Sequence, residues 1–271
     1  MRRDALLGLL FGLFAVLVGA TSAFAQEQRR ESSCIAMAGD WPGPIHAAYV
    51  PTGSQGDDTV TITYAGHSTY VIETPKGVRI ATDFSGIYGA DPLPRVVTMN
   101  KAHRSHYTNA VDPRIEYVLR GWNPDGGPAR HALTVDDVYI RNVTTDIRSG
   151  MGMEPDGNSI FIFEVAGLCI GHLGHLHHKL EDRHYAAIGR LDVVMVPIDG
   201  GMTQSLDNMK EISDRLYSSI VLPMHRNATP LAEFTGRMGA AFDVELRSER
   251  SLDVSVRTLP ERPRIIVLEG V

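Results

Sequence analysis

The sequence of 271 residues predicts an α/β protein with a core of two β-sheets and helices on the outside. Short β-branched and aromatic runs, separated by turn residues, fill the first part of the chain after residue 58. Segments with helical apolar spacing alternate with apolar strands in the second part. With 43% apolar and 21% charged residues, the composition is ordinary for a globular chain that buries a sizeable core.

The first part of the chain is predicted to be a meander of short strands. Pro75-Lys76-Gly77 and Ala166-Gly167 are typical turn sequences between strands. The expected strands span residues 59–64, 69–74, 78–82, 95–99, 115–119, 137–141, 159–165 and 168–171.

The second part adds helices between apolar strands. Helices are predicted over residues 179–188, 206–216 and 230–238; in the first, Leu180, His184 and Ile188 are spaced four apart. Strands are expected over 192–198 and 220–224, and residues 241–268 return to strands. Because no repeat or linker interrupts these elements, we expect one domain over residues 59–271.

The first 25 residues are typical of a cleaved signal peptide. Arg2 and Arg3 precede an uncharged apolar run over 5–20, and Ala23-Phe24-Ala25 fits the small-x-small cleavage pattern. The run has about 16 residues, short of the ~20 that span a bilayer, which disfavours an uncleaved membrane anchor. We therefore expect a periplasmic or secreted protein with no stable membrane span, whose residues 26–58 form an irregular lead-in.

The chain has two cysteines, Cys34 and Cys169. An oxidising compartment permits a disulfide between them. Cys34 lies in a polar stretch, however, and Cys169 lies in an apolar strand-like run. The sequence therefore favours two unpaired thiols with Cys169 buried, and pairing is the alternative.

The net charge of the chain limits which classes of binding partner are expected. A formal net charge of −6 argues against a general nucleic-acid binder. We expect a small-molecule substrate instead, and no pattern in the sequence specifies an oligomeric state.

Histidines gather where predicted strands end. They are His103 and His106 after one strand, His172, His175, His177 and His178 after a second, and His225 after a third. Strand ends converge at one edge of a sheet, where active sites of α/β folds commonly lie. Imidazole is also the commonest metal ligand at neutral pH. The pattern thus predicts one metal pocket, and a polar loop without a ligand is the alternative for residues 171–178.

The motifs around these histidines follow a recognisable order. They are GHSTYVIE at 66–73, VTMNKAHRSH at 97–106, IGHLGHLHH at 170–178, DVVMVPIDGG at 192–201 and LPMH at 222–225. This order resembles the metallo-β-lactamase-fold hydrolases, and is most similar to the branch that includes ascorbate-phosphate lactonase and related zinc hydrolases. The resemblance covers roughly residues 58–230. It implies a four-layer αββα sandwich, of the α+β or α/β class, with the site on one edge.

The resemblance also shows where this chain departs from the family, in which two metals are typical. Lys101 stands in place of the first motif histidine, Ser105 in place of the motif aspartate, and His175 in place of the bridging aspartate. Residues 142–146, where a later family ligand is expected, contain no histidine, and Asp146 is the strong ligand there.

These departures predict one metal ion per chain, which we expect to be zinc. The expected ligands are His106, His175 and His225, with His103 as an adjustable fourth ligand. Lys101 is expected where the first metal would lie, with its ammonium supplying the lost positive charge.

The expected function is a zinc-dependent hydrolase that acts on a small ester, lactone or phosphoester through a metal-bound water. Ser105 cannot serve as the base, because its hydroxyl is not acidic enough. The proton is therefore expected to go to Asp146 or to one of His172, His177 and His178, of which His178 is the candidate. Lys101 is expected to polarise an anionic substrate or stabilise an oxyanion. The alternatives are a catalytically inactive protein of this fold that binds a metal or small anion, and a protein-interaction domain.

Overall fold

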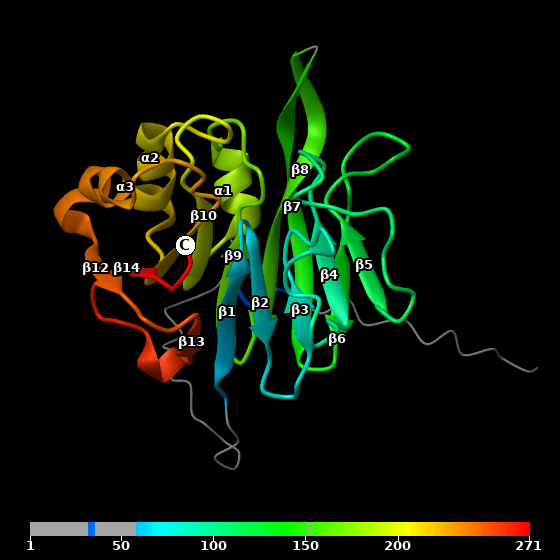
Figure 1. The fold of residues 1–271 in the computed structure, drawn as a ribbon, viewed down its shortest axis with the longest axis horizontal. Coiled ribbons are helices and arrows are strands. Elements are labelled where there is room, and N and C mark those ends of the chain that lie inside the picture. Colours follow the sequence, from blue (N-terminus) through cyan, green and yellow to red (C-terminus); the bar gives the residue numbers. More distant parts are fainter. Residues whose placement is uncertain (1–31, 36–57, 151) are drawn as a thin grey trace, which may run out of the picture.

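The computed structural model describes residues 32–35, 58–150 and 152–271. These residues form two facing β-sheets, with helices packed on the outer face of one of them (Figure 1). The signal peptide and most of the lead-in that the sequence predicts lie outside the described residues. None of the helices in the described ranges is long and apolar enough to cross a membrane.

The first sheet has six strands in the order β13-β1-β2-β3-β4-β5. Their bounds are β1 Val60–Gly66, β2 Thr69–Glu73, β3 Arg79–Ala81, β4 Val96–Met99, β5 Tyr117–Arg120 and β13 Ser251–Val254. Burial alternates along β1, since every second side chain faces the second sheet. The strands β3, β4 and β5 are parallel, which brings the loops after β3 and β4 to the same edge.

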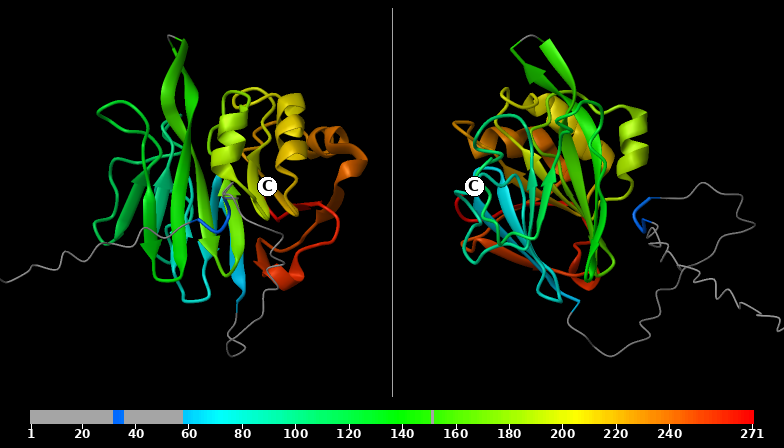
Figure 2. Two further views of the ribbon diagram at one scale, coloured as in Figure 1. Left: turned by 180° about the vertical axis from the view of Figure 1, so that it is seen from behind. Right: turned by 90° about the vertical axis from the view of Figure 1, so that its right-hand side faces the viewer.

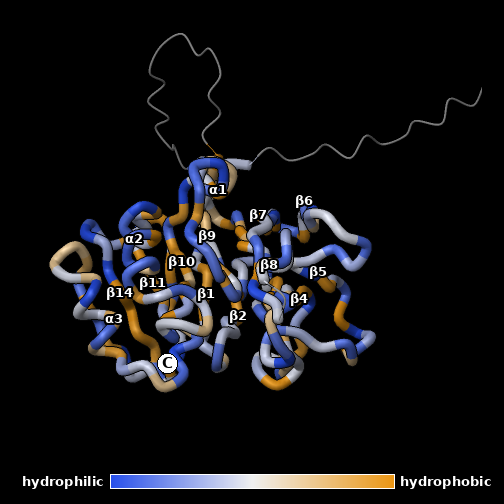
Figure 3. Tube along the Cα trace, turned by 90° about the horizontal axis from the view of Figure 1, so that it is seen from above, coloured by the Kyte–Doolittle hydropathy of each residue, from blue (hydrophilic) through white to orange (hydrophobic). Residues whose placement is uncertain are grey.

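The second sheet has eight strands in the order β12-β14-β11-β10-β9-β8-β7-β6. Their bounds are β6 Ala132–Val135, β7 Val138–Ser149, β8 Gly152–Val165, β9 Leu168–His172, β10 Val193–Pro197, β11 Ile220–Met224, β12 Asp243–Leu246 and β14 Arg264–Val267. Five neighbouring strands of this sheet, β12, β14, β11, β10 and β9, are parallel to one another. Both β10 and β11 are buried over their whole length and carry mainly hydrophobic residues (Figure 3), as is typical of strands covered on both faces.

The helices cover the outer face of the second sheet. Their bounds are α1 Asp182–Ile188, α2 Leu206–Leu216 and α3 Leu231–Met238, followed by the short 3-10 helices η1 Gly239–Ala241 and η2 Val256–Thr258. Met209, Ile212 and Phe234 pack against this face of the sheet. The predicted bounds of α2 are confirmed. The first helix begins later than predicted, because Glu181 forms its N-terminal capping box.

The hairpin of β7 and β8 is much longer than predicted and projects beyond the rest of the sandwich (Figure 2). Its outer half, around Thr144 and Glu154, is polar and lacks the alternating pattern from which strands are predicted. Strand β6 was not predicted either. It pairs only with β7 at the edge of the sheet, so its sequence is weakly constrained by burial.

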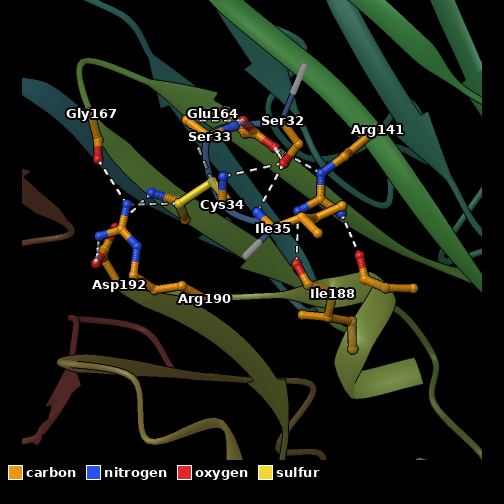
Figure 4. The surroundings of a disulfide bond; sticks show 12 residues. Ser32, Ser33, Cys34, Ile35, Arg141, Glu164, Gly167, Ile188, Arg190 and Asp192 are labelled. Atoms are coloured by element: carbon orange, nitrogen blue, oxygen red, sulfur yellow. Dashed lines mark hydrogen bonds and ion pairs between the residues drawn. A yellow bond between two sulfur atoms is a disulfide. The ribbon is translucent and has the colours of Figure 1, made fainter. Parts of the chain in front are cut away.

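Cys34 and Cys169 form a disulfide, so the prediction of two free thiols was wrong. The polar surroundings of Cys34 reflect a buried polar partner rather than an exposed position, because Cys34 is only 3% exposed. Figure 4 shows the arrangement: Ser32 and Ser33 donate hydrogen bonds to the carboxylate of Glu164. That carboxylate in turn accepts a hydrogen bond from Arg141 Nε at 2.7 Å. The disulfide therefore fastens residues 32–35 to the second sheet.

We predict that Cys34→Ser lowers the free energy of unfolding by about 2–4 kcal/mol, since the disulfide joins residues 135 positions apart. Thermal denaturation with and without a thiol reductant measures the effect. Reductant should lower the Tm of the unaltered protein and leave that of Cys34→Ser in place. Equal loss of Tm in both proteins would contradict the assignment.

Candidate metal centre

Four histidines lie together at the edge of the sandwich where loops of the two sheets meet. They are His103, His106, His175 and His225, and their possible ligand atoms all lie within 4.8 Å of one another. His103 and His106 follow β4 of the first sheet, whereas His175 and His225 follow β9 and β11 of the second. The structure thus brings together all four residues that the sequence singles out as metal ligands.

The buried nitrogens of this cluster fit a metal ion. Nε2 of His106, of His175 and of His225 is buried without a hydrogen-bond partner within the described part of the chain. Leaving a buried polar atom unpaired costs free energy, so three such atoms in one place need a shared partner. A divalent cation between the rings satisfies all three, and an all-imidazole donor set suits zinc and other late transition metals.

Each of these three rings is held through its other nitrogen. His106 Nδ1 lies 2.8 Å from Asp83 Oδ2, and His225 Nδ1 lies 2.9 Å from Asp199 Oδ2. Because a carboxylate only accepts, each of these Nδ1 atoms carries the proton and leaves Nε2 free as a ligand. His175 Nδ1 lies 2.7 Å from His177 Nε2, a contact that fixes the orientation of the ring, and His177 Nδ1 in turn accepts a hydrogen bond from the Arg148 amide.

Asp83 connects the cluster to the buried interior. Burial alone would raise the pKa of Asp83, but the neighbouring His172 and His106 outweigh it. Hydrogen bonds from His106 and Asn100 act in the same direction, so the pKa lies well below its usual range. Asn100 Oδ1 also accepts a hydrogen bond from Ser159 N in β8, which links this carboxylate to the second sheet.

Asp199 is held in the same manner after β10. Burial raises the pKa of its carboxyl, but hydrogen bonds from His225, Thr203 and the Gly201 amide lower it well below the usual range. The sequence prediction gave neither Asp83 nor Asp199 a role. Both aspartates follow directly after a strand and lie close to the histidine motifs, and this position could have indicated their role.

Two histidines of the cluster, His175 and His103, favour their neutral form. Burial lowers the pKa of His175 to about 2, and the nearby His106 and His225 add to the effect. Burial also lowers the pKa of His103. At neutral pH their ring nitrogens are therefore available as ligands without the loss of a proton.

A fifth histidine, His67, lies beside the cluster in the turn between β1 and β2. Its Nε2 is 3.1 Å from Ser105 Oγ, and its ring centroid is 4.3 Å from that of His225. His67 has a positive φ of 55°, and its carbonyl accepts hydrogen bonds from the His225 amide and from Tyr64 Oη. His67 belongs to the motif GHSTYVIE at 66–73, from which no role at the site was predicted for it.

The predicted catalytic residues are not brought into the cluster. Lys101 is exposed and forms an ion pair with Glu154 of the projecting hairpin. Asp146 lies in the same hairpin, where its amide donates to His178 Nε2 at 3.0 Å. These contacts form because β7 and β8 extend much further than predicted. The hairpin carries Asp146 and contacts both Lys101 and His178.

His172 points between the sheets rather than joining the four histidines of the cluster. It is fully buried, and its Nε2 lies 2.8 Å from the Ser68 carbonyl. Ile170 packs in the same core between the sheets and Cys169 in the core under the helices, as the alternation of side chains along β9 predicts.

A two-sheet sandwich with a histidine cluster at the edge shared by both sheets defines a protein of the metallo-β-lactamase fold. The chain belongs to the β-lactamase superfamily, because its residues 61–225 match the family model of the beta-lactamase superfamily domain. This confirms the predicted fold class. In the described residues, loops rather than helices cover the outer face of the first sheet.

Proteins with similar sequences or structures support the assignment to this superfamily. A metal-dependent hydrolase of Pyrococcus furiosus is 25% identical over 198 residues, covering 63% of this chain and 86% of the relative. One of Thermoplasma volcanium is 22% identical over 196 residues, covering 62% and 84%. A solved structure from Thermotoga maritima, of a metallo-β-lactamase superfamily protein, has 26% identity and a TM-score of 0.56, covering 78% of this chain and 100% of that one.

We predict that His225→Ala removes bound metal from the purified protein, because it deletes a ligand together with the ring that Asp199 holds in place. Elemental analysis after exhaustive dialysis measures the loss. His131→Ala is the matched control, since His131 contacts the Arg120 carbonyl outside the cluster. Full metal content in His225→Ala would refute the assignment of this ligand.

Asp199→Asn should weaken metal binding by about 10–100-fold, because a neutral amide holds the His225 ring less firmly and no longer balances the charge of the cation. Competition with a chromogenic chelator gives the affinity. An unchanged affinity would show that the carboxylate has no part in the site.

Proposed function

We propose that this protein is a zinc-dependent hydrolase with one zinc ion per chain, acting on a small ester, lactone or phosphoester. The observation that carries the proposal is the set of three buried imidazole nitrogens that have no partner among the described residues, each on a ring held by a hydrogen bond at its other nitrogen. Membership of the superfamily and the metal-dependent hydrolases among the relatives support it.

A bound zinc ion supplies Lewis acidity, which lowers the pKa of a coordinated water and polarises the bond to be cleaved. The chain's own residues define the surroundings of that chemistry. Asp83 and Asp199 fix the His106 and His225 rings and provide buried negative charge against the cation. His103 is the half-buried member of the four, so the cluster opens to solvent on its side.

Ser105 and His67 provide the polar groups next to the cluster. The Ser105 hydroxyl lies 3.1 Å from His67 Nε2 and 3.4 Å from His103 Nδ1. A hydroxyl held between two imidazoles can donate to or accept from a substrate oxygen next to the metal site. In this proposal Ser105 and His67 orient the substrate.

A non-catalytic metal-binding protein is the second candidate, and the ligand count favours it. Four histidines are enough to fill a tetrahedral zinc site, which is the arrangement of closed structural sites rather than open catalytic ones. Catalysis in the first proposal would therefore require that His106, His175 and His225 hold the metal and that His103 not be a permanent ligand.

We predict that the zinc-loaded protein hydrolyses at least one substrate in a panel of aryl esters, lactones and bis-aryl phosphodiesters. His225→Ala and chelation should each abolish the activity, whereas His131→Ala should retain it. Protein with one tightly bound zinc and no activity across the panel would favour the non-catalytic candidate.

Lys101→Ala should change kcat/KM by less than about threefold, since Lys101 forms an exposed ion pair with Glu154 rather than a contact in the cluster. Steady-state kinetics on the best substrate of the panel tests this. A loss of two orders of magnitude would return Lys101 to the role that the sequence suggested.

We also propose that the protein acts in the periplasm or outside the cell. The pattern of residues 1–25 is that of an export signal, and the disulfide of Cys34 and Cys169 is a bond that persists in oxidising compartments. Cell fractionation combined with mass spectrometry of the N-terminus tests the proposal, which an intact Met1 in a cytoplasmic fraction would contradict.

A further inference from the structure

Strand β12 forms an open edge of the eight-stranded sheet, at the opposite edge from β6 (Figure 1). Two aliphatic side chains on it are exposed, Val244 by 47% and Leu246 by 70%. They lie on the same face of the sheet as Ile265 and Val267 of the neighbouring β14. An open strand edge with exposed aliphatic residues is a place where a further strand can be added.

The backbone of β12 offers hydrogen bonds on its free side. The amides of Asp243 and Arg247 donate to carbonyls on the β14 side, of Pro263 and Val267, at 2.9 Å each. Because successive residues of a strand point their backbone groups to opposite sides, the N–H and C=O groups of Val244 and Leu246 face away from β14. The described residues provide no hydrogen-bond partner for these four groups.

We propose that β12 pairs with β12 of a second copy of this chain, antiparallel about a two-fold axis at Glu245. In this register Val244 of each copy lies opposite Leu246 of the other. Both residues point their free backbone groups outward, so each such pair exchanges two hydrogen bonds. The exposed aliphatic side chains then cover one another across the axis.

The charged face of β12 is complementary to itself in the same register. Asp243 of each copy lies opposite Arg247 of the other, and both side chains are partly exposed. Glu245 lies opposite its own equivalent, but Arg247 Nε and Arg264 Nη1 of its own chain hold its carboxylate at 2.7 and 2.8 Å. The charges therefore oppose one another across the axis at Asp243 and Arg247 and are balanced locally at Glu245.

Neighbouring registers are less favourable. A shift that places Leu246 opposite itself pairs Val244 with Ser248, which lies in a bend after the strand. The opposite shift pairs Leu246 with Phe242, which precedes the strand and is buried in the protein's own core. The register about Glu245 keeps all pairs within residues 243–247. A second copy is the partner we propose because one strand supplies both halves of every pair, as a two-fold interface requires.

Sedimentation velocity over a range of protein concentrations tests the proposal on the whole protein. We expect a reversible dimer whose dissociation constant rises by about tenfold or more in Leu246→Lys. Ile87→Lys is the matched control, because Ile87 is 72% exposed in the loop after β3 and should leave the dimer unchanged. A monomer at all concentrations, or a Leu246→Lys protein that dimerises as tightly as the unaltered one, would overturn the proposal.

A charge exchange tests the register itself. Asp243→Arg and Arg247→Asp should each weaken self-association, because each places like charges opposite one another across the axis. A mixture of the two variants should recover a mixed dimer, in which both 243–247 pairs are again of opposite charge. A variant that merely fails to fold cannot give this recovery. A mixture that stays monomeric, while the unaltered protein dimerises, would contradict the register.

Discussion

The site depends on one constraint: imidazole nitrogens from both sheets must meet at a buried point, with their outer nitrogens already occupied. Asp83 and Asp199 meet this requirement for His106 and His225, and His177 meets it for His175. Each hydrogen bond fixes the orientation of a ring, and the two carboxylates also fix the position of the proton on the rings that they contact. Without these partners the rings could turn their free nitrogens away from one another, and no shared cation site would form.

The arrangement of the two sheets brings the histidines close enough to share one cation. Parallel pairing of β3, β4 and β5 in one sheet, and of β9, β10 and β11 in the other, brings the loops that follow these strands to one edge. Asn100 connects the two halves, because its amide donates to Asp83 and accepts from the Ser159 amide in the second sheet. A displacement of one sheet against the other would therefore change the position of the His106 ring through Asn100 and Asp83.

Sequence patterns predicted those features that depend on local periodicity or on the ends of strands. Strand β11 and helix α2 have the predicted bounds, and the cluster of four histidines was found because each follows a strand. Contacts between distant segments were not predictable in this way. The polar residue Ser33, beside Cys34, has its partner 131 positions away in Glu164. The ion pair of Lys101 depends on a hairpin whose outer half has no strand pattern. His67 also directly follows a strand, but no role was predicted for it, because the predicted strand ended at Tyr64.

The chemistry that we propose requires one metal ion in the place where the family typically holds two. The most direct test is a crystal structure of the zinc-loaded protein with data at the zinc absorption edge. Our account predicts a single anomalous peak about 2.0–2.1 Å from Nε2 of His106, His175 and His225, with His103 as the fourth neighbour. Two peaks about 3.5–4 Å apart, or a peak away from these rings, would contradict it.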